Sequence, residues 1–199
     1  MTATAGAEAP ELIVGLGNPG ARYAATRHNA GFWFVERLAE ALDAAWRPNK
    51  RVHGELAEGR WDGRTLRLLK PDTFMNHAGR AVAAAAGYWR IPPGRILVVH
   101  DDLDLPPGAV RLKRGGGHGG HNGLRDILAA LGDAGFWRLR LGIGHPGLRE
   151  AVVGYVLGAP DPDQRAAIEN AIERALAERE ALLSGRMAAV MQALHGAGA

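Results

Sequence analysis

The sequence predicts one α/β domain with a mixed β-sheet. Segments typical of strands alternate with segments typical of helices, 47% of the 199 residues are apolar, and no repeat or linker divides the chain. We expect a disordered tail over residues 1–10, the domain over 11–195 and a short C-terminal tail over 196–199. Residues 1–10 are rich in alanine and lack the basic start and apolar run of a signal peptide.

Apolar runs and periodic spacing predict the elements of the N-terminal half. The run 12–16 is followed by Gly-Asn-Pro-Gly, which is typical of a buried strand that ends in a turn. Between residues 29 and 46 the apolar residues recur at three- and four-residue steps, so we expect an amphipathic helix. An Asp-Gly pair separates 56–61 from 65–69, and these two segments predict a β-hairpin.

The same criteria predict the elements of the C-terminal half. The expected strands are 95–99, 109–113, 137–143 and 152–157, and the expected helices are 75–89, 123–131 and a long one that ends near Leu183. The long helix begins at Asp161, where an N-cap aspartate, an N1 proline and the N3 glutamine Gln164 all favour a helix start.

Polar residues follow two of the predicted buried strands. Asn18 comes just after the first strand, and Asp101 follows the strand 95–99. In sheets with parallel strands, ligands gather beyond the carboxyl ends of the strands. We therefore expect Asn18 and Asp101 to share one crevice.

The segment 99–123 combines an acid cluster with a glycine-rich loop (residues 115–121). Three carboxylates lie within 101–104, and glycines surround His118, His121 and the adjoining Asn122. Glycine at this density allows close approach to the backbone, which favours docking of a large ligand. A magnesium site at the acids is an alternative, since this ion takes one or two carboxylates together with substrate phosphates. A zinc site at the two histidines is another, but it lacks a third ligand, and we favour neither metal.

Basic residues gather around this loop, although the formal net charge of the chain is only +3. The six residues are Arg111, Lys113, Arg114, Arg125, Arg138 and Arg140. A local basic field suits a polyanion such as nucleic acid. The alternative interpretation is a solvated, arginine-rich surface.

Two side chains are candidates for chemistry at the starts of predicted helices. The neighbouring Arg27 and the helix dipole both disfavour an imidazolium at His28, so we expect a neutral histidine that can act as a base. Asn76 stands before an alanine-rich helix, where its amide can face the crevice. Each residue has a plainer alternative role, as a surface or capping group for His28 and as a helix cap for Asn76.

The residue inventory also restricts the mechanism. The chain has no cysteine, and its one serine, Ser184, lies near the end of the last predicted helix. Covalent serine or cysteine catalysis is therefore excluded for an ester hydrolase, and a base-activated water is what remains.

A glycine motif suggests a different class of protein, a dinucleotide-binding oxidoreductase. Residues 15–20 match Gly-x-Gly-x-x-Gly after a strand. The loop continues beyond Gly20, however, and the acids about twenty residues on, Glu36 and Glu40, lie on a predicted helix rather than at a strand end. We do not favour this interpretation.

Five motifs, in order and spacing, resemble bacterial peptidyl-tRNA hydrolase. They are Gly-Leu-Gly-Asn-Pro-Gly, Thr-Arg-His-Asn-Ala-Gly, Thr-Phe-Met-Asn, His-Asp-Asp-Leu-Asp-Leu-Pro-Pro-Gly and Gly-Gly-His-Asn-Gly, and the resemblance covers about residues 12–157. It implies a single-domain three-layer sandwich, with a mixed, largely parallel twisted sheet flanked by helices. It also implies a monomeric enzyme of the bacterial cytoplasm that cleaves the ester between peptide and terminal ribose of tRNA, with no metal, no organic cofactor, no membrane and no obligate protein partner.

The resemblance assigns roles to particular residues. It implies that His28 is the catalytic base and that Asp101 orients it. The substrate-binding residues that it implies are Asn18, Tyr23, Met75, Asn76 and Asn122, and the tRNA-binding residues are Arg111, Lys113 and Arg138. A non-catalytic RNA-splicing relative with the same fold is the alternative, and the presence of His28, Asp101 and the asparagines argues for catalysis.

Overall fold

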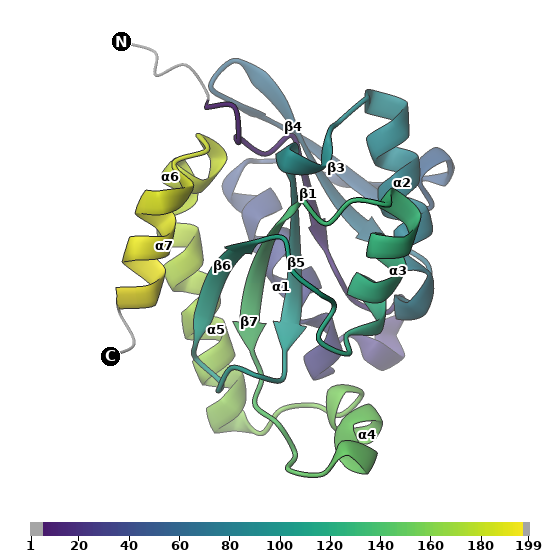
Figure 1. The fold of residues 1–199 in the computed structure, drawn as a ribbon, viewed down its shortest axis with the longest axis vertical. Helices are drawn as coiled ribbons and strands as arrows, with labels where there is room; N and C mark the ends of the chain where they lie inside the picture. The colour runs from purple at the N-terminus through teal and green to yellow at the C-terminus, as the bar shows by residue number, and fades with distance from the viewer. Residues whose placement is uncertain (1–5, 197–199) are drawn as a thin grey trace.

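An open, twisted β-sheet runs through the computed structural model, which describes residues 6–196 (Figure 1). Within those residues it has seven strands in the order β2-β3-β4-β1-β5-β7-β6. The strands are β1 (Leu12–Gly15), β2 (Trp46–Asn49), β3 (Gly54–Trp61), β4 (Arg64–Pro71), β5 (Ile96–Asp102), β6 (Val110–Arg114) and β7 (Trp137–Gly142). The four central strands β4, β1, β5 and β7 are parallel, and β3 and β6 run against them. The predicted mixed, largely parallel sheet is confirmed.

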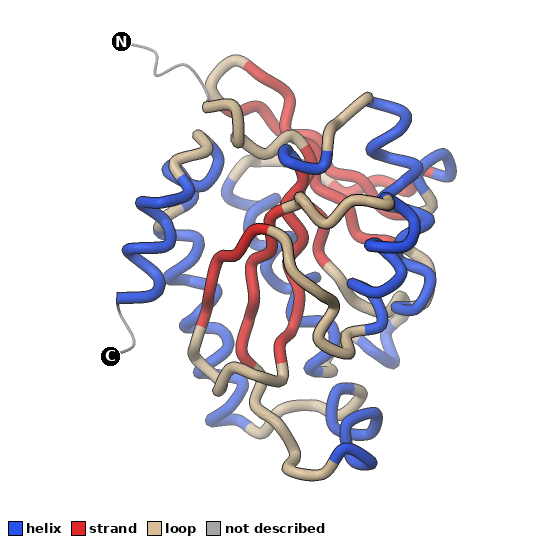
Figure 2. Tube along the Cα trace, in the orientation of Figure 1, coloured by secondary structure: helices blue, strands red, loops and turns tan. Residues whose placement is uncertain are grey.

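Helices cover both faces of the sheet and make a three-layer sandwich (Figures 1 and 2). They are α1 (Ala30–Ala41), α2 (Ala78–Trp89), α3 (Asn122–Leu131), α4 (Val152–Val156), α5 (Pro162–Ala177), α6 (Arg179–Leu183) and α7 (Met187–Gly196). One core joins the sheet to α1, α5, α6 and α7, and a second core joins the opposite face to α2 and α3. No helix within residues 6–196 has the length and apolarity that crossing a membrane requires.

The central strands are apolar throughout because both of their faces are covered. On β1, Ile13 packs into the core with α1, whereas Leu12 and Val14 pack into the core with α2 and α3. All four residues of β1 and the first six of β5 are buried. The continuous apolar runs of the sequence, rather than an alternating pattern, are the signature of such doubly covered strands.

The segment 152–157 is not a strand, and that prediction was wrong. It forms the short helix α4, preceded by the 3-10 turn η6 (Arg149–Ala151). Val152 and Val156, four residues apart, pack against the core while Val153 is 67% exposed. This is helical spacing, and a six-residue window hides it because four of the six residues are valine or leucine, which are also common in strands.

The other boundary differences lie at the ends of the chain and at one edge of the sheet. The expected long helix starts at the Asp161 capping box, as predicted, but it breaks at Glu178 into α5 and α6, and α7 follows. The strand β2 was not predicted, and its first residue, Trp46, was assigned to the expected helix 29–46, which ends at Ala41 in the structure. An edge strand tolerates the proline of β2, since its outer N–H groups have no partner to lose.

The first residues that the structure describes pack against the domain. Gly6 N donates to Ser184 O at 3.1 Å, and Ala9 is fully buried. The predicted disordered tail is therefore wrong for residues 6–10, and its residues 1–5 lie outside the described range. At the other end α7 includes Gly196, so the expected C-terminal tail is limited to residues 197–199, which also lie outside that range.

Candidate active site

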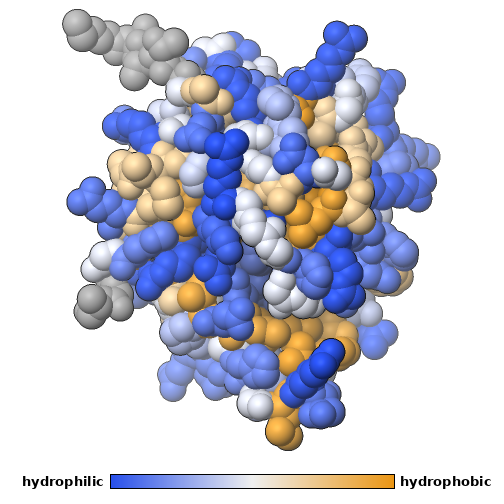
Figure 3. Space-filling view, viewed as in Figure 1, coloured by the Kyte–Doolittle hydropathy of each residue, from blue (hydrophilic) through white to orange (hydrophobic). Residues whose placement is uncertain are grey.

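A cavity of about 400 Å³ opens where β1 and β5 end. Asn18 and Asp101 both line it, which confirms the crevice that the sequence predicted. Residues of the glycine-rich loop, of η4 (Met75–His77) and of α4 complete the wall. The rim at α4 is apolar, with Val153 67% and Leu157 39% exposed, and Figure 3 shows apolar surface at this lower end of the molecule.

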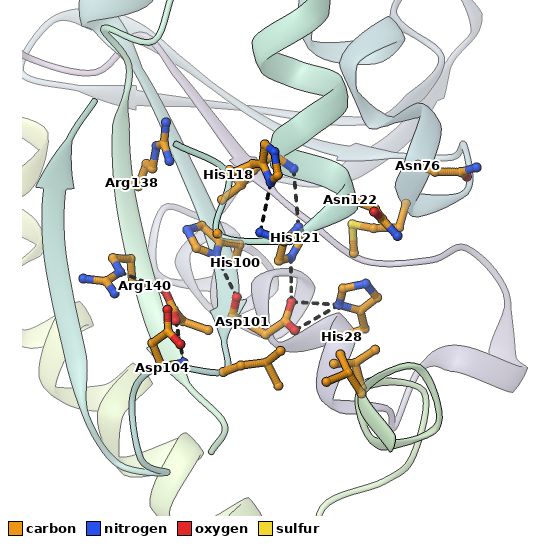
Figure 4. Close-up of a pocket in the computed structure, with 18 of the residues that line it drawn as sticks. His28, Asn76, His100, Asp101, Asp104, His118, His121, Asn122, Arg138 and Arg140 are labelled. Carbon is orange, nitrogen blue, oxygen red and sulfur yellow. Dashed lines mark hydrogen bonds and ion pairs between the residues drawn. The ribbon is translucent and has the colours of Figure 1, made fainter. Parts of the chain in front are cut away.

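A buried histidine and a buried aspartate face each other in the cavity. His28 lies in the 3-10 turn η2 (Arg27–Asn29), and its Nδ1 is 2.9 Å from Oδ2 and 3.0 Å from Oδ1 of Asp101, at the end of β5 (Figure 4). Within residues 6–196 the second ring nitrogen, Nε2, has no hydrogen-bond partner. Since Asp101 accepts at Nδ1, the proton of a neutral ring sits there and Nε2 keeps its lone pair.

Electrostatics makes His28 more basic than the sequence argument expected. Burial alone lowers the pKa of His28, but the charge and the hydrogen bond of Asp101 outweigh it and raise the pKa above 6.5. Arg27 does not oppose this effect, because its guanidinium turns away to Tyr155 O at 2.9 Å and Gln164 Oε1 at 2.8 Å. The sequence argument that Arg27 disfavours an imidazolium at His28 was therefore wrong, and a neutral His28 that acts as a base stays a prediction.

Asp101 has a second partner that the sequence argument did not find. His121 Nε2 lies 2.9 Å from Oδ1 of Asp101, and His121 Nδ1 accepts the backbone N–H groups of Gly123 and Leu124 at the start of α3. Burial would raise the pKa of Asp101, but His28 and His121 together hold it well below its usual range. The sequence analysis considered His121 as a loop residue and a possible zinc ligand, and nothing in the sequence indicated that it bonds to Asp101.

His100 lies behind this group and is neutral. Its Nδ1 is 2.7 Å from the backbone oxygen of Asp101, and its buried Nε2 has no partner among residues 6–196. Burial, and then the nearby His121, lower the pKa of His100 to about 4. The ring therefore fills the back of the cavity without adding a positive charge to it.

Asn18 is fixed by its neighbours on three sides. Its backbone N–H donates to Asn29 Oδ1 at 2.9 Å, and Asn29 Nδ2 returns a bond to Asn18 O at 3.0 Å. The side-chain Oδ1 of Asn18 accepts the backbone N–H of Met75 at 2.7 Å. The remaining group, the Nδ2 amide, is the donor that Asn18 can offer to a ligand in the cavity.

The other two predicted asparagines line the same cavity but are exposed. Asn76 lies in η4 and Asn122 is the first residue of α3. Figure 4 shows the Asn76 side chain directed away from His28 and Asp101, whereas Asn122 lies between Asn76 and His121. All three asparagines thus line the cavity that holds His28, and the Asn76 side chain points away from that histidine.

One cluster of possible metal ligands occurs among residues 6–196, formed by His28, Asp101 and His121 with their ligand atoms within 4.8 Å of one another. The two histidines point their nitrogens at the carboxylate. His121 Nδ1 accepts backbone N–H groups, so its Nε2 must carry the proton that it donates to Asp101. This distribution of donors and acceptors fits a hydrogen-bonded group rather than a metal centre.

Comparison with known proteins identifies the family of this chain. The model of a family described as peptidyl-tRNA hydrolase matches residues 12–199. The chain belongs to the peptidyl-tRNA hydrolase family.

Individual relatives agree over nearly the whole length. The chain is 54% identical to a peptidyl-tRNA hydrolase of Alkalilimnicola ehrlichii, covering 93% of this chain and 94% of that one, and 56% identical to one of Methylococcus capsulatus, covering 92% and 98%. The crystal structure of peptidyl-tRNA hydrolase from Acinetobacter baumannii superposes with a TM-score of 0.90 at 46% identity, covering 93% of this chain and 94% of that chain.

Two further residues that the family resemblance implied differ in position. Met75 is buried, lines the cavity and packs so closely on α3 that a Cβ at Gly123 would lie 2.6 Å from its sulfur. Tyr23, in η1 (Ala21–Tyr23), is not among the lining residues. Its ring packs edge-on against the ring of Phe74, which lines the cavity, with ring centroids 6.4 Å apart.

The basic residues expected at the peptidyl-tRNA hydrolase site divide into two groups. Lys113 is exposed and lines the cavity, as does Arg140, whose Nε donates to Asp102 at 2.8 Å. Arg111 instead donates to Val110 O and Leu194 O, away from the cavity lining. Arg138 also lines the cavity, but it is only 2% exposed and donates to two backbone oxygens, so its role in tRNA binding stays a prediction.

Proposed function

We propose that this chain hydrolyses the ester bond between the peptide and the terminal ribose of peptidyl-tRNA with a water molecule that His28 activates. The observation that carries the proposal is the pair of His28 and Asp101 in the cavity, with Nδ1 bound to the carboxylate and Nε2 free. Membership of the peptidyl-tRNA hydrolase family supports the same reaction.

The base works through its second nitrogen. His28 Nε2 takes a proton from water as the oxygen attacks the ester carbonyl, and the imidazolium that forms is stabilised by Asp101. When the tetrahedral intermediate collapses, the same proton passes to the leaving ribose oxygen. The products are free tRNA and the peptide acid, which loses its own proton to solvent. A positioned base of this kind typically contributes about 10² to 10⁴ in rate.

Asn18 is our choice for the donor to the developing oxyanion. Its Oδ1 is occupied by Met75 N–H, which fixes the amide and leaves Nδ2 to donate. Asn76, the other candidate that the sequence left open, is exposed and turned away from His28. One fixed donor to an oxyanion contributes on the order of 10² to 10³ in rate.

In this proposal, one set of residues binds the peptide end of the substrate and another set binds the tRNA end. Asn122, at the mouth of the cavity, binds the first peptide amide, which a free aminoacyl-tRNA lacks. Asn76 binds further along the peptide at the rim. Lys113 and Arg140 bind tRNA phosphates, and such binding depends on salt but little on sequence.

We also propose that the protein acts as a monomer and that it acts in the bacterial cytoplasm. A binding-only role, in which the fold holds RNA without turnover, is the alternative. It would leave the pairing of His28 with Asp101 without a purpose, since neither buried side chain offers a cation to a phosphate.

The experiment is hydrolysis of N-acetylaminoacyl-tRNA by the wild-type chain and by His28→Ala, each with excess EDTA. We expect full wild-type turnover in EDTA and a loss of several orders of magnitude in His28→Ala with tRNA binding retained. Activity abolished by EDTA would point to an essential metal, and an active His28→Ala would remove the proposed base. Tight tRNA binding without wild-type turnover would favour the binding-only role.

A further inference from the structure

The glycine-rich loop has little structure of its own. Residues 115–121 form neither helix nor strand, and Gly115, Gly116, Gly119 and Gly120 have φ values of 70°, 96°, 58° and 83°. Two internal bonds, both at 2.9 Å, join His118 to the residues that follow it. A segment this flexible in the unfolded chain is ordered only if contacts from outside hold it.

Within residues 6–196, few groups outside the glycine-rich loop bond to it. At one end Gly115 N donates to Phe136 O at 3.1 Å, and at the other His121 bonds to Asp101 and to the first turn of α3. Between these ends, Arg138 donates from Nη2 to Gly116 O at 2.6 Å and from Nη1 to Gly117 O. Arg138 is therefore the side chain that holds the middle of the loop.

Arg138 is itself held rigidly. It lies on β7, paired with Val98 of β5 on one side and Lys113 of β6 on the other, and only 2% of it is exposed. Its guanidinium stacks over the Phe136 ring at 4.7 Å and has no carboxylate partner among residues 6–196. A buried guanidinium stays charged, so its two bonds to carbonyl oxygens are charge-assisted and directional.

We propose that Arg138 is a positioning residue that fixes the glycine-rich loop and thereby places His121 against Asp101 and Asn122 beside the cavity. This inference rests on the function proposed for His28 and Asp101. Figure 4 shows Arg138 on the β7 side of the cavity, with His118 and His121 between it and His28. Arg138 thus acts on the reaction through the loop, without touching substrate.

The decisive variant is Arg138→Lys, which keeps the charge and most of the stem but loses the planar pair of donors. We expect kcat to fall about tenfold or more as His121 shifts and KM to rise as Asn122 shifts, with the salt dependence of kcat/KM unchanged. We also expect the acid limb of the pH profile to move to higher pH. With His121 displaced, Asp101 has one donor fewer and holds the proton of His28 more strongly.

Lys113→Gln is the matched control, because Lys113 is paired with Arg138 in the sheet but is exposed in the cavity wall. Losing a phosphate contact there should raise KM and lower the salt slope of kcat/KM by about one. If Arg138→Lys instead behaved like Lys113→Gln, with its kcat intact and its salt slope reduced, Arg138 would be a tRNA contact and our proposal would be overturned.

Hydrogen exchange provides a readout independent of turnover. The backbone amides of residues 115–121 should exchange at least severalfold faster in Arg138→Lys and Arg138→Met, and at the wild-type rate in His28→Ala. Turnover by His28→Ala would contradict the proposed function. Hydrogen exchange in the glycine-rich loop would still test the role proposed for Arg138. Unchanged exchange in both Arg138 variants, or loss of the native fold in both, would show that Arg138 does not act on the loop specifically.

Discussion

The two walls of the cavity are built in opposite ways. The wall at the ends of β1 and β5 carries Asn18 and Asp101, both buried and each held by several hydrogen bonds. The other wall is the glycine-rich loop, whose middle is held by Arg138 and which leads into exposed Asn122 at the start of α3. Groups that must meet the reacting atoms are placed on rigid strand ends, and groups that meet a variable peptide lie on the adaptable side.

Asp101→Asn should give the largest effect on the rigid wall. Without the carboxylate charge, only burial acts on His28, so its pKa falls below 6.5 and the acid limb of kcat/KM moves to lower pH. An asparagine also permits the unproductive tautomer of His28, so kcat should fall on the order of 10³ to 10⁴. The pH dependence of kcat/KM measures both effects.

Asp102→Asn is the control for that change, since Asp102 pairs with Arg140 and not with His28. Its acid limb should stay at the wild-type pH. An Asp101→Asn variant with the wild-type acid limb would contradict the electrostatic coupling of Asp101 to His28.

A second comparison sets Asn18→Ala against Asn122→Ala, one from each wall. Removing the fixed donor of Asn18 should lower kcat about 10²-fold or more with little change in KM. Removing Asn122 should raise KM for peptidyl-tRNA about tenfold with a smaller effect on kcat. Steady-state kinetics with N-acetylaminoacyl-tRNA separates the two, and equal losses in kcat would show that the walls do not divide the work.

The smallest expected effect concerns stability against acid. The folded chain holds His100 neutral with a pKa of about 4, whereas an unfolded histidine titrates at 6.5. Unfolding therefore takes up a proton between these values, so this contribution is complete above pH 6.5 and is lost as the pH falls towards 4. The loss is about 1.4 kcal/mol per pH unit, or roughly 3 kcal/mol in all.

Denaturant unfolding of the wild type and of His100→Asn at several pH values tests this. The raised pKa of His28 acts in the opposite direction, because it stabilises the fold at low pH and that contribution disappears as the pH rises through the folded pKa. His28 is present in both proteins, so the difference in slope isolates His100. If the free energy of unfolding fell equally steeply from pH 6.5 to 4 in both proteins, His100 would take up no extra proton on unfolding, and the folded chain would not hold it neutral.

Much of the fold was predictable because local and global signals agree. The apolar run of β1 and the capping box at Asp161 each need only neighbouring residues to be recognised. The strand β2 and the helix α4 were missed or misassigned because the edge pairing of β2 and the burial of Val156 depend on tertiary contacts.

The residues of the site that come directly after strands could be predicted from the sequence. The residues whose role depends on the direction of a side chain or on the burial of a charge could not. Asn18 and Asp101 follow strands, so topology alone brings them together. The pairing of His121 with Asp101, the burial of Arg138 and the turn of Arg27 towards Tyr155 depend on side-chain directions. Counting cations near a motif does not tell which of them face solvent.

The docking of α7 on β6 has a consequence for association between molecules. β6 is an edge strand, and His195 Nε2 accepts its Leu112 N–H at 3.1 Å while Arg111 donates to Leu194 O. Burial, and then the nearby Arg111, lower the pKa of His195, which preserves this acceptor. A histidine lone pair thus occupies a position where a strand from another copy could add, and the helix end protects an edge that would otherwise invite aggregation.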